Sequence, residues 1–404
     1  MKAKQEVSAV TPASLQGVRI ARIATVPFFV VTQLKQQIES LAASGARVTV
    51  VTSYGPELAA LTALPDVNCV PVAIPRSIAP WRDLLALVRL WMFFRKEQID
   101  IAHSTTPKAG LLTAIAASMA GVPIRLHTFT GQPWVGMRGI KHWLARGSDW
   151  LIGRLNTRCY ADSVSQRQFL VEQGVLDAQQ LFVIGAGSLA GVDINRFDRE
   201  RFPADQQHAL LQSLRIPADV EVLLFVGRIT IEKGVRELLN AFVGIKAAGS
   251  RAHLVFVGPF DSDSGAGGDI SPHEINAVQD THLVGYAECP EQYMSIADIL
   301  CLPSYREGFG TVVIEAAAMS VPTIGTNIYG LSDAIEDGKT GVLVIPQDSN
   351  SLRKGLAMLL ADKALRIKMG MFARQRAEEM FAADRVNALV IEEYRCQLKR
   401  SGLQ

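Results

Sequence analysis

The sequence predicts an α/β protein of two domains, each built on a mostly parallel sheet. At 404 residues the chain is too long for one ordinary core. Short apolar runs typical of strands alternate with helical stretches, and a polar, charged segment at 198–207 interrupts this alternation once. Because strand–helix alternation produces parallel strands covered on both faces, each half should form a doubly wound sheet.

The first domain is expected over residues 17–200. It opens with a strand over 18–24 and a helix over 32–44 that Gly45 ends, followed by a strand over 47–52. Its other strands are predicted over 68–72, 99–103, 124–128, 158–162 and 181–184.

The second domain is expected over residues 217–380, after a boundary at about residues 200–217. Its strands are predicted over 221–226, 252–257, 281–284, 299–302, 322–325 and 342–345. The charged segment 363–398 favours helix, and residues 381–404 should pack back on the first domain. Parallel sheets bind ligands at the carboxyl ends of their strands, so both domains should present loops to a central cleft.

Composition excludes several classes of function. A net charge of +2, from 41 basic and 39 acidic residues, argues against a nucleic-acid binder driven by global charge. Five scattered cysteines without a C-x-x-C pair favour a reducing compartment and no zinc site. Residues 1–16 lack the apolar run of a signal peptide, and the apolar stretch 109–124 is short for a membrane span. We therefore expect a soluble or peripheral protein.

Two carboxylates, Glu307 and Glu315, flank a Gly-x-Gly turn between a buried strand and a helix over 311–319. The first amides of a helix lack internal partners, which makes this junction an anion site. Glu307 lies in the loop and Glu315 about one turn into the helix, so both are expected to face one ligand. The alternative for Glu315 is a capping or surface carboxylate.

A second strand-to-helix loop carries two cations, Arg228 directly after the strand and Lys233 before the next helix. An arginine fork and a mobile lysine charge suit a diphosphate. Two solvated loop cations are the alternative.

Together, Gly227-Arg228, Lys233-Gly234 and the E-G-F-G-x-x-x-x-E run from Glu307 to Glu315 resemble the retaining glycosyltransferases of family 4. That family has the GT-B fold, two Rossmann-like domains facing a central cleft. The resemblance covers nearly the whole chain, and segments 103–110 and 184–193 are similar to its capsule and O-antigen branch.

The resemblance implies a role for each motif residue. Arg228 and Lys233 would hold the donor diphosphate and neutralise the leaving nucleotide. Glu307 would bind hydroxyls of the donor sugar, and Glu315 the ribose hydroxyls. Further substrate contacts would come from Gly308, Phe309, Gly310, Thr311, Gly258 and Tyr286, the last of these beside the nucleobase.

Two first-domain histidines end predicted strands. His127 is expected to face the cleft and position the donor sugar, with a structural role as the alternative. His103 is a candidate substrate contact, although a buried structural histidine is favoured. Relatives often carry a second histidine where this chain has Thr105, so no histidine pair is expected.

The chain departs from the family pattern after its first strand, where relatives often carry a Gly-Gly loop. Segment 26–31 has no glycine, which leaves the acceptor contacts open and counts against a nicotinamide-binding domain. The D-x-D sequence at 261–263 lies in a glycine-rich loop and is interpreted as a chance occurrence, with a metal site as the alternative. Neither a metal nor another cofactor is expected.

Tryptophans interleave with basic residues over 134–158, which favours a peripheral helix on anionic lipid or a mouth for a phosphate-bearing acceptor. Segment 81–96 is similar in character, but a core-packing helix with snorkelling cations is favoured there. A lipid-diphosphate-linked sugar acceptor would account for both.

The resulting hypothesis is a retaining transferase that moves a sugar from a nucleotide-diphospho-sugar, UDP favoured, to a lipid-linked saccharide of a bacterial surface polysaccharide (capsule, O-antigen of lipopolysaccharide, or exopolysaccharide). It would act at the cytoplasmic face of the inner membrane. Two alternatives stay open: a GT-B sugar-nucleotide epimerase, and a non-catalytic two-lobed binding protein.

Overall fold

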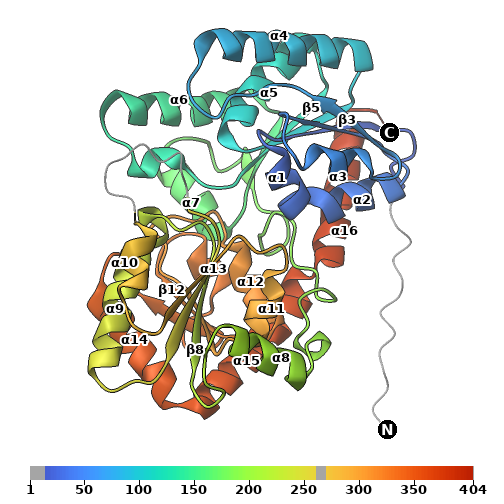
Figure 1. Cartoon of the computed structure of the whole chain (residues 1–404). Helices are drawn as coiled ribbons and strands as arrows, with labels where there is room; N and C mark the ends of the chain where they lie inside the picture. The colour runs from blue at the N-terminus through green and yellow to red at the C-terminus, as the bar shows by residue number, and fades with distance from the viewer. Residues whose placement is uncertain (1–13, 261–269, 404) are drawn as a thin grey trace.

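The computed structural model describes residues 14–260 and 270–403 and confirms two Rossmann-like α/β domains (Figure 1). The first sheet has strand order β3-β2-β1-β4-β5-β6-β7 and the second has β10-β9-β8-β11-β12-β13. All recorded strand pairings are parallel. The carboxyl ends of both sets of strands therefore carry the loops that meet between the domains.

The strands fall close to the ranges predicted from sequence. They are β1 (Arg19–Ile23), β2 (Arg47–Thr52), β3 (Val67–Pro71), β4 (Ile101–Thr105), β5 (Ile124–Phe129), β6 (Arg158–Ala161), β7 (Leu181–Phe182), β8 (Val222–Val226), β9 (His253–Val257), β10 (Thr281–Gly285), β11 (Ile299–Leu302), β12 (Thr323–Thr326) and β13 (Gly341–Val344).

Helices cover both faces of each sheet. In the first domain they are α1 (Pro27–Phe29), η1 (Val30–Leu34), α2 (Lys35–Ala43), α3 (Leu58–Thr62), α4 (Pro80–Glu97), α5 (Pro107–Ala120), η2 (Pro133–Gly136), α6 (Gly139–Leu155) and α7 (Val164–Glu172). Those that follow are η3 (Arg199–Arg201), α8 (Ala204–Ser213), η4 (Ile231–Lys233), α9 (Val235–Ala247), α10 (Pro272–Asn276), α11 (Pro290–Ser295), α12 (Thr311–Ala318), α13 (Leu331–Ala334), α14 (Ser349–Ala361), α15 (Lys363–Phe381) and α16 (Ala383–Arg400).

The first helical segment begins earlier than expected. Instead of a loop over 26–31 and a helix from residue 32, the chain turns into α1 at Pro27, passes through the π-helical η1 and continues as α2. Proline suits this first helical position because its missing N–H has no partner to lose there. The segment that lacks the glycine loop is thus helical, and it lies at the cleft.

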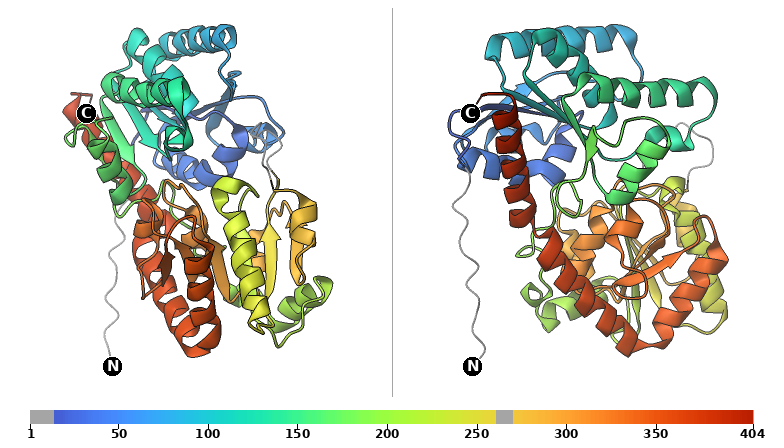
Figure 2. Two further views of the ribbon diagram at one scale, coloured as in Figure 1. Left: turned by 90° about the vertical axis from the view of Figure 1, so that its left-hand side faces the viewer. Right: turned by 180° about the vertical axis from the view of Figure 1, so that it is seen from behind.

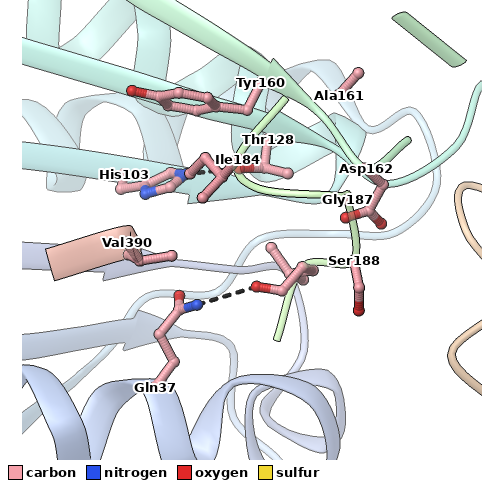
Figure 3. Close-up of a pocket in the computed structure, with 11 residues that line it drawn as sticks. Gln37, His103, Thr128, Tyr160, Ala161, Asp162, Ile184, Gly187, Ser188 and Val390 are labelled. Atoms are coloured by element: carbon pink, nitrogen blue, oxygen red, sulfur yellow. Dashed lines mark hydrogen bonds between the residues drawn. The ribbon is translucent and has the colours of Figure 1, made fainter. Parts of the chain in front are cut away.

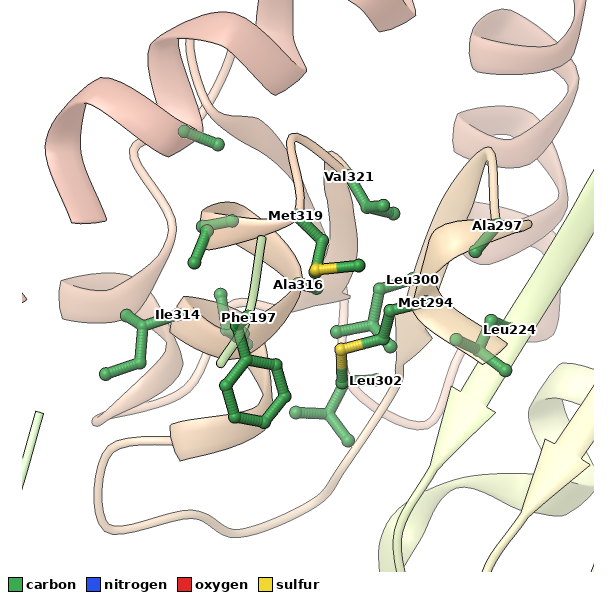
Figure 4. Packing of buried hydrophobic residues seen from close by; sticks show 14 of the residues in the cluster. Phe197, Leu224, Met294, Ala297, Leu300, Leu302, Ile314, Ala316, Met319 and Val321 are labelled. Carbon is green, nitrogen blue, oxygen red and sulfur yellow. The ribbon is translucent and has the colours of Figure 1, made fainter. Parts of the chain in front are cut away.

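The second domain is held by two apolar layers, one on each face of its sheet. Successive residues of β8 alternate between them: Leu224 packs in one layer and Leu223 in the other. Figure 4 shows Leu300, Leu302 and Met294 meeting Phe197 in the first of these layers. Phe197 precedes the expected domain boundary, so the chain already enters the second core there.

The chain passes between the domains at two adjacent points. Val192 donates its amide to the carbonyl of Phe381 at 2.8 Å, and Ala383 donates to the carbonyl of Val192 at 2.8 Å. Beyond this bridge α16 runs along the first domain, as the rear view of Figure 2 shows. Its residues Val390 and Tyr394 lie in the core of that domain.

Helix α4 packs in the core as expected, but only through one of its faces. Ala86, Leu90 and Phe94 are buried. The opposite face is open to solvent, with Trp81 81% and Leu85 60% exposed. Among the residues that the structure describes, no helix is both long enough and apolar enough to span a membrane.

Candidate functional site

The loops that follow β8 and β11 bring Lys233 and Glu307 together. Lys233 Nζ lies 2.5 Å from Glu307 Oε1, and Ser304 Oγ donates to the same oxygen at 2.8 Å. The two charged side chains are mostly buried, 22% and 13% exposed. A cation from one loop and a carboxylate from the other therefore form one polar centre at the carboxyl edge of the second sheet.

Backbone contacts lock these two loops to each other. The amide of Tyr305 donates to the carbonyl of Glu232 at 2.8 Å, and Arg306 pairs with the Glu232 carboxylate at 2.7 Å. Gly234 has φ +69°, and a Cβ there would lie 2.0 Å from the carbonyl oxygen of Pro303. Only glycine allows this approach, so the Lys-Gly pair fixes the position of the lysine.

Arg228 follows β8 and Tyr286 follows β10, on either side of β9 at the same edge of the sheet, and both are exposed. Gly258 is buried, and a Cβ on it would lie 1.9 Å from the carbonyl oxygen of Gly227. Gly258 thus packs the backbone ends of β8 and β9 together. The Tyr286 ring meets Phe28 of the first domain edge-on, with centroids 6.0 Å apart.

Glu315 lies on α12, in the wall of a cavity of about 280 Å³ between the domains. The same cavity is lined by Gln33 and Lys35 of the first domain and by Arg196 of the linking segment. Burial raises the pKa of Glu315 to about 7, an effect that the Arg196 guanidinium opposes and the Glu291 carboxylate reinforces. Glu315 is therefore not a solvated surface carboxylate.

Arg196 is itself held in place by a two-pronged ion pair. Its Nε and Nη2 lie 3.0 and 2.9 Å from the two oxygens of Glu291. The guanidinium thus adds a fixed positive charge near Glu315. The sequence reasoning missed it, because the linking segment offered no motif beyond its position between two sheets.

Three residues of the first domain touch the second beside these loops. Thr311 Oγ1 donates to Gln33 Oε1 at 3.2 Å across the cleft. Gly330 donates its amide to Ser165 Oγ at 2.8 Å. A Cβ on Gly308 would lie 2.5 Å from the carbonyl oxygen of Thr130, so β5 delivers Thr130 to the turn beside Glu307.

Thr130, Gln33 and Ser165 were not predicted as site residues. Thr130 directly follows a predicted strand, so the rule that ligands gather at carboxyl ends of strands could have found it. Gln33 and Ser165 lie in helices with no distinguishing sequence pattern.

The expectation that His127 faces the cleft is wrong. Its ring is 1% exposed and points towards α5, where its Cε1 lies 2.4 Å from the Cβ position of Gly110. Ser104 Oγ bonds its Nδ1 at 2.9 Å, and burial lowers the pKa of His127 to about 3. Since successive strand residues face opposite sides, ending a strand did not ensure that this side chain would reach the ligand.

His103 is a structural histidine as well, and its assignment as a substrate contact is corrected. Its Nε2 bonds Thr128 Oγ1 at 2.8 Å, while Arg22 and Tyr394 both approach its Nδ1 at 2.5 Å. Burial, reinforced by the Arg22 charge, holds the pKa of His103 well below its usual value. Figure 3 shows the ring beside a small internal cavity with Thr128 and Tyr160.

No group of three or more potential metal-binding His, Cys, Asp or Glu side chains occurs within residues 14–260 and 270–403. The D-x-D sequence at 261–263 lies outside the described residues. Two protein cations, Lys233 and Arg228, lie in one loop of the centre, and the N-terminus of α12 follows Glu307 closely in the chain. Such a set suits an anionic leaving group attached to a polyhydroxyl compound.

Comparison with known families gives two matches that together span most of the chain. The family described as "Glycosyl transferases group 1" matches residues 206–376, and the "Glycosyl transferase 4-like domain" matches residues 30–187. The boundary between the matches coincides with the passage from the first sheet to the second.

Individual glycosyltransferases are also similar to this chain over most of its length. The capsular polysaccharide biosynthesis glycosyltransferase CapM of Staphylococcus aureus is 29% identical over 376 residues, 91% of this chain and 94% of its own. An Escherichia coli enzyme named UDP-Gal:α-D-GlcNAc-diphosphoundecaprenol α-1,3-galactosyltransferase is 25% identical. The match covers 72% of this chain and 74% of that enzyme. A glycosyltransferase structure from Rickettsia africae superposes with a TM-score of 0.78 at 20% identity, covering 95% of this chain and 99% of its own, and supports the fold.

Proposed function

The chain belongs to the GT-B glycosyltransferases of family 4, and from that premise we propose that it transfers a sugar, with retention of configuration, from a UDP-sugar to a lipid-linked saccharide. The observation that carries the donor side is the Lys233–Glu307 pair in the loops that border the cleft. It joins a cation suited to a diphosphate with a carboxylate suited to sugar hydroxyls.

Along the donor, the diphosphate lies at Arg228 and Lys233, the sugar at Glu307 and the ribose at Glu315. The bond from the anomeric carbon to the phosphate oxygen breaks, and the acceptor hydroxyl attacks the same face. The acceptor proton passes to the departing phosphate, so nucleoside diphosphate leaves and configuration is retained. Fixed cations stabilise the charge that develops on the leaving group, an effect that often dominates catalysis. Neither a metal nor another cofactor takes part in this proposal.

The acceptor side rests on the relatives and on one surface. The E. coli relative is named for a GlcNAc-diphosphoundecaprenol substrate, and CapM for capsular polysaccharide biosynthesis. In this chain, α6 exposes Ile140, Trp143 and Trp150, while Arg154 lies 5.8 Å from the Trp150 ring. An apolar face with basic neighbours fits a peripheral position on anionic lipid at the cytoplasmic face of the membrane.

Trp134 is not part of that surface. It is 2% exposed, and its Nε1 donates to Asp149 at 2.7 Å. Within the tryptophan-rich stretch, the surface available for lipid is therefore the exposed face of α6.

The test of the donor is a thermal-shift panel of UDP-, GDP- and ADP-sugars. A ligand present at about 100 times its Kd stabilises the folded state by about 2.7 kcal/mol. We expect a UDP-sugar to raise the melting temperature of the wild type and of Lys339→Ala, a control lysine in an exposed ion pair. Lys233→Ala should lose most of the shift.

Two outcomes would contradict the proposal. An equal shift in Lys233→Ala would remove the diphosphate from this loop. Conversion of the donor into another sugar nucleotide without any acceptor would identify an epimerase instead.

A further inference from the structure

The first domain carries an open groove of about 380 Å³ that the donor site does not use. It lies between the first turns of α4 and the loops that follow β2 and β3. Tyr54 and Ile74 line it from the loops, and Arg82, Leu85 and Arg89 from the helix. These three helix residues share one face, because they are three and four positions apart.

The groove has a fixed frame. Ser53 Oγ donates to the Ile74 carbonyl at 3.0 Å and accepts from the Ile74 amide at 2.9 Å, which joins the two loops. Lys108 of α5 bonds the Ser77 carbonyl at 2.9 Å and Asp83 at 2.7 Å, which anchors the start of α4. The groove is thus built into the fold.

Its two arginines have no countercharge. Across residues 14–260 and 270–403, neither Arg82 nor Arg89 forms an ion pair or a hydrogen bond with another residue. The acids of α4 are engaged elsewhere, Asp83 with Lys108 and Glu97 with Lys96. A guanidinium group can donate two parallel hydrogen bonds to two oxygens of a phosphate, so the groove is complementary to a phosphate-bearing ligand.

A row of apolar side chains runs along α4 beside the arginines. Trp81, Leu84, Leu85, Val88 and Met92 are between 41% and 81% exposed and follow helical spacing. The end of the helix bearing Trp81 is nearest the groove, and Figure 1 shows α4 on the side of the first domain away from the second. Exposed apolar surface of this extent marks a site for a partner, a lipid or a ligand.

The groove is also connected to the cleft. A Cβ on Gly55, in the loop after β2, would lie 2.6 Å from Pro27 Cγ, so this loop packs on the start of α1. The next residue, Phe28, meets Tyr286 across the cleft. The loop after β2, which lines the groove at Tyr54, is therefore linked through α1 to the donor side of the cleft.

We infer that this groove binds the phosphate-bearing end of a polyprenyl-type lipid, with the phosphate between Arg82 and Arg89 and the hydrocarbon along Trp81, Leu84 and Leu85. This inference rests on the proposed function, because the lipid is the carrier of the acceptor sugar. It assigns the acceptor's phosphate to α4, where the sequence had favoured a core-packing helix, and leaves α6 as a separate contact with the membrane.

The decisive experiment compares two double variants of α4. Arg82→Ser/Arg89→Ser removes the groove cations, whereas Arg95→Ser/Lys96→Ser removes the same charge further along the helix. Farnesyl diphosphate is titrated into each in detergent below its micelle concentration. We expect the first variant to bind at least tenfold more weakly than the wild type and the second to match it. Equal affinities in both variants would overturn the inference.

Further ligands distinguish binding by the arginines from binding by the apolar row, and a polyprenyl phosphate from other phosphate-bearing ligands. Farnesol and inorganic diphosphate should each bind at least tenfold more weakly than farnesyl diphosphate, because each offers one half of the recognised group. Trp81→Ser/Leu85→Ser should weaken farnesyl diphosphate but not inorganic diphosphate. If vesicles of anionic phospholipid compete as well as farnesyl diphosphate, the groove is a general headgroup site and the inference is wrong.

Transfer assays keep this inference apart from the proposed function. With a lipid-linked acceptor, Arg82→Ser/Arg89→Ser should raise the acceptor KM at least tenfold without changing slow hydrolysis of the donor. If the wild type transfers no sugar, the proposed function fails. The farnesyl diphosphate titration still shows whether the groove binds a polyprenyl-type diphosphate. If the wild type transfers and both double variants keep its KM, the groove assignment fails.

Discussion

Glu315 shows how one environment defines the chemistry of a residue. Its carboxyl lies in the interdomain cavity, where burial raises its pKa to about 7. An ionised carboxylate accepts hydrogen bonds from two ribose hydroxyls, whereas a protonated one offers less acceptor capacity. Donor binding should therefore favour the ionised form and lower this pKa.

From this we predict a pH dependence of nucleotide affinity. Because the ligand prefers ionised Glu315, affinity is present above pH 7 and declines below it, by at most about tenfold per pH unit. Glu315→Gln should bind UDP about tenfold more weakly at pH 8, and the wild-type advantage should shrink as the pH falls. Calorimetric titrations from pH 5.5 to 8.5 give the ratio of the two Kd values, in which titration of UDP itself cancels. A constant ratio would remove Glu315 from the ribose site.

Asp149 predicts a pH dependence of stability. Burial raises its pKa to about 7, although the hydrogen bond from Trp134 opposes this. Since the folded pKa exceeds the unfolded one, the stabilising contribution is complete below about pH 4 and is lost as the pH rises to about 7, by up to roughly 1.4 kcal/mol per unit.

Asp149→Asn keeps a side-chain oxygen that can accept the hydrogen bond from Trp134. It should remove the loss of stability between about pH 4 and pH 7, because asparagine does not ionise. The free energy of unfolding, measured by chemical denaturation, should increase in the variant relative to the wild type between pH 5 and pH 8. Parallel behaviour of the two proteins at both pH values would show that Asp149 titrates normally.

Sequence reasoning placed some site residues correctly and others wrongly, because different features of the fold determine their positions. Lys233 and Glu307 lie beside glycines in loops at strand ends, so loop geometry alone brings them together. His127 and His103 lie in strands, where one position in register decides which face a side chain occupies. Neither histidine's direction could be predicted without the packing of α5 and α16.

At the scale of elements, the turn at Gly308 packs against the end of β5 across the cleft. Gly308 does not have a positive φ, but a Cβ on it would lie 2.5 Å from the Thr130 carbonyl. Gly308→Ala should therefore hold the two elements apart without straining its own backbone. A displacement of this kind can cost up to about 100-fold in turnover.

The matched control is Gly147→Ala on α6, where no atom lies within 4 Å of the new Cβ. It should keep full turnover and gain about 0.5–1 kcal/mol of stability from helix propensity. Steady-state kinetics and melting curves of both variants check this. Full turnover in Gly308→Ala would show that the contact does not matter for catalysis.

Strand positions could be predicted because each buried strand is a short apolar run between turn residues. Helix details could not. The π-helical η1 depends on how Val30 and Leu34 pack in the first core. One face of α4 is exposed because no other element of the described chain packs against it. Both properties come from neighbours that are distant in the sequence.

At the scale of the molecule, α16 joins the end of the chain to the first domain. Tyr394 Oη accepts from buried Arg22 at 2.8 Å and bonds His103. Because Nε and Nη2 of Arg22 already lack partners within the described chain, the tyrosine hydroxyl is a principal partner of a buried charge.

Tyr394→Phe should destabilise the first domain by about 1–3 kcal/mol, the usual cost of leaving a buried polar group unsatisfied. Tyr293→Phe, which lies against the second core, is the control. Calorimetry with hydrogen exchange shows which domain weakens. An unchanged first domain in Tyr394→Phe would show that α16 does not clamp it.

The two-domain plan could be predicted from the interruption of one repeating pattern. The relation between the domains could not, since it depends on Gln33, Thr130, Ser165 and the bridge at Val192, each from a different segment. The order of groups along the donor remains the central claim that these contacts support.

Single-turnover transfer by Glu307→Gln tests that claim most directly. Labelled UDP-sugar and a lipid-linked acceptor are mixed with excess enzyme, with Glu336→Gln as a surface control and UDP affinity measured in parallel. If Glu307 binds the reacting sugar, its variant should transfer at least about 100-fold more slowly, while UDP affinity and the control remain at wild-type values. Transfer at the wild-type rate by Glu307→Gln would contradict the account.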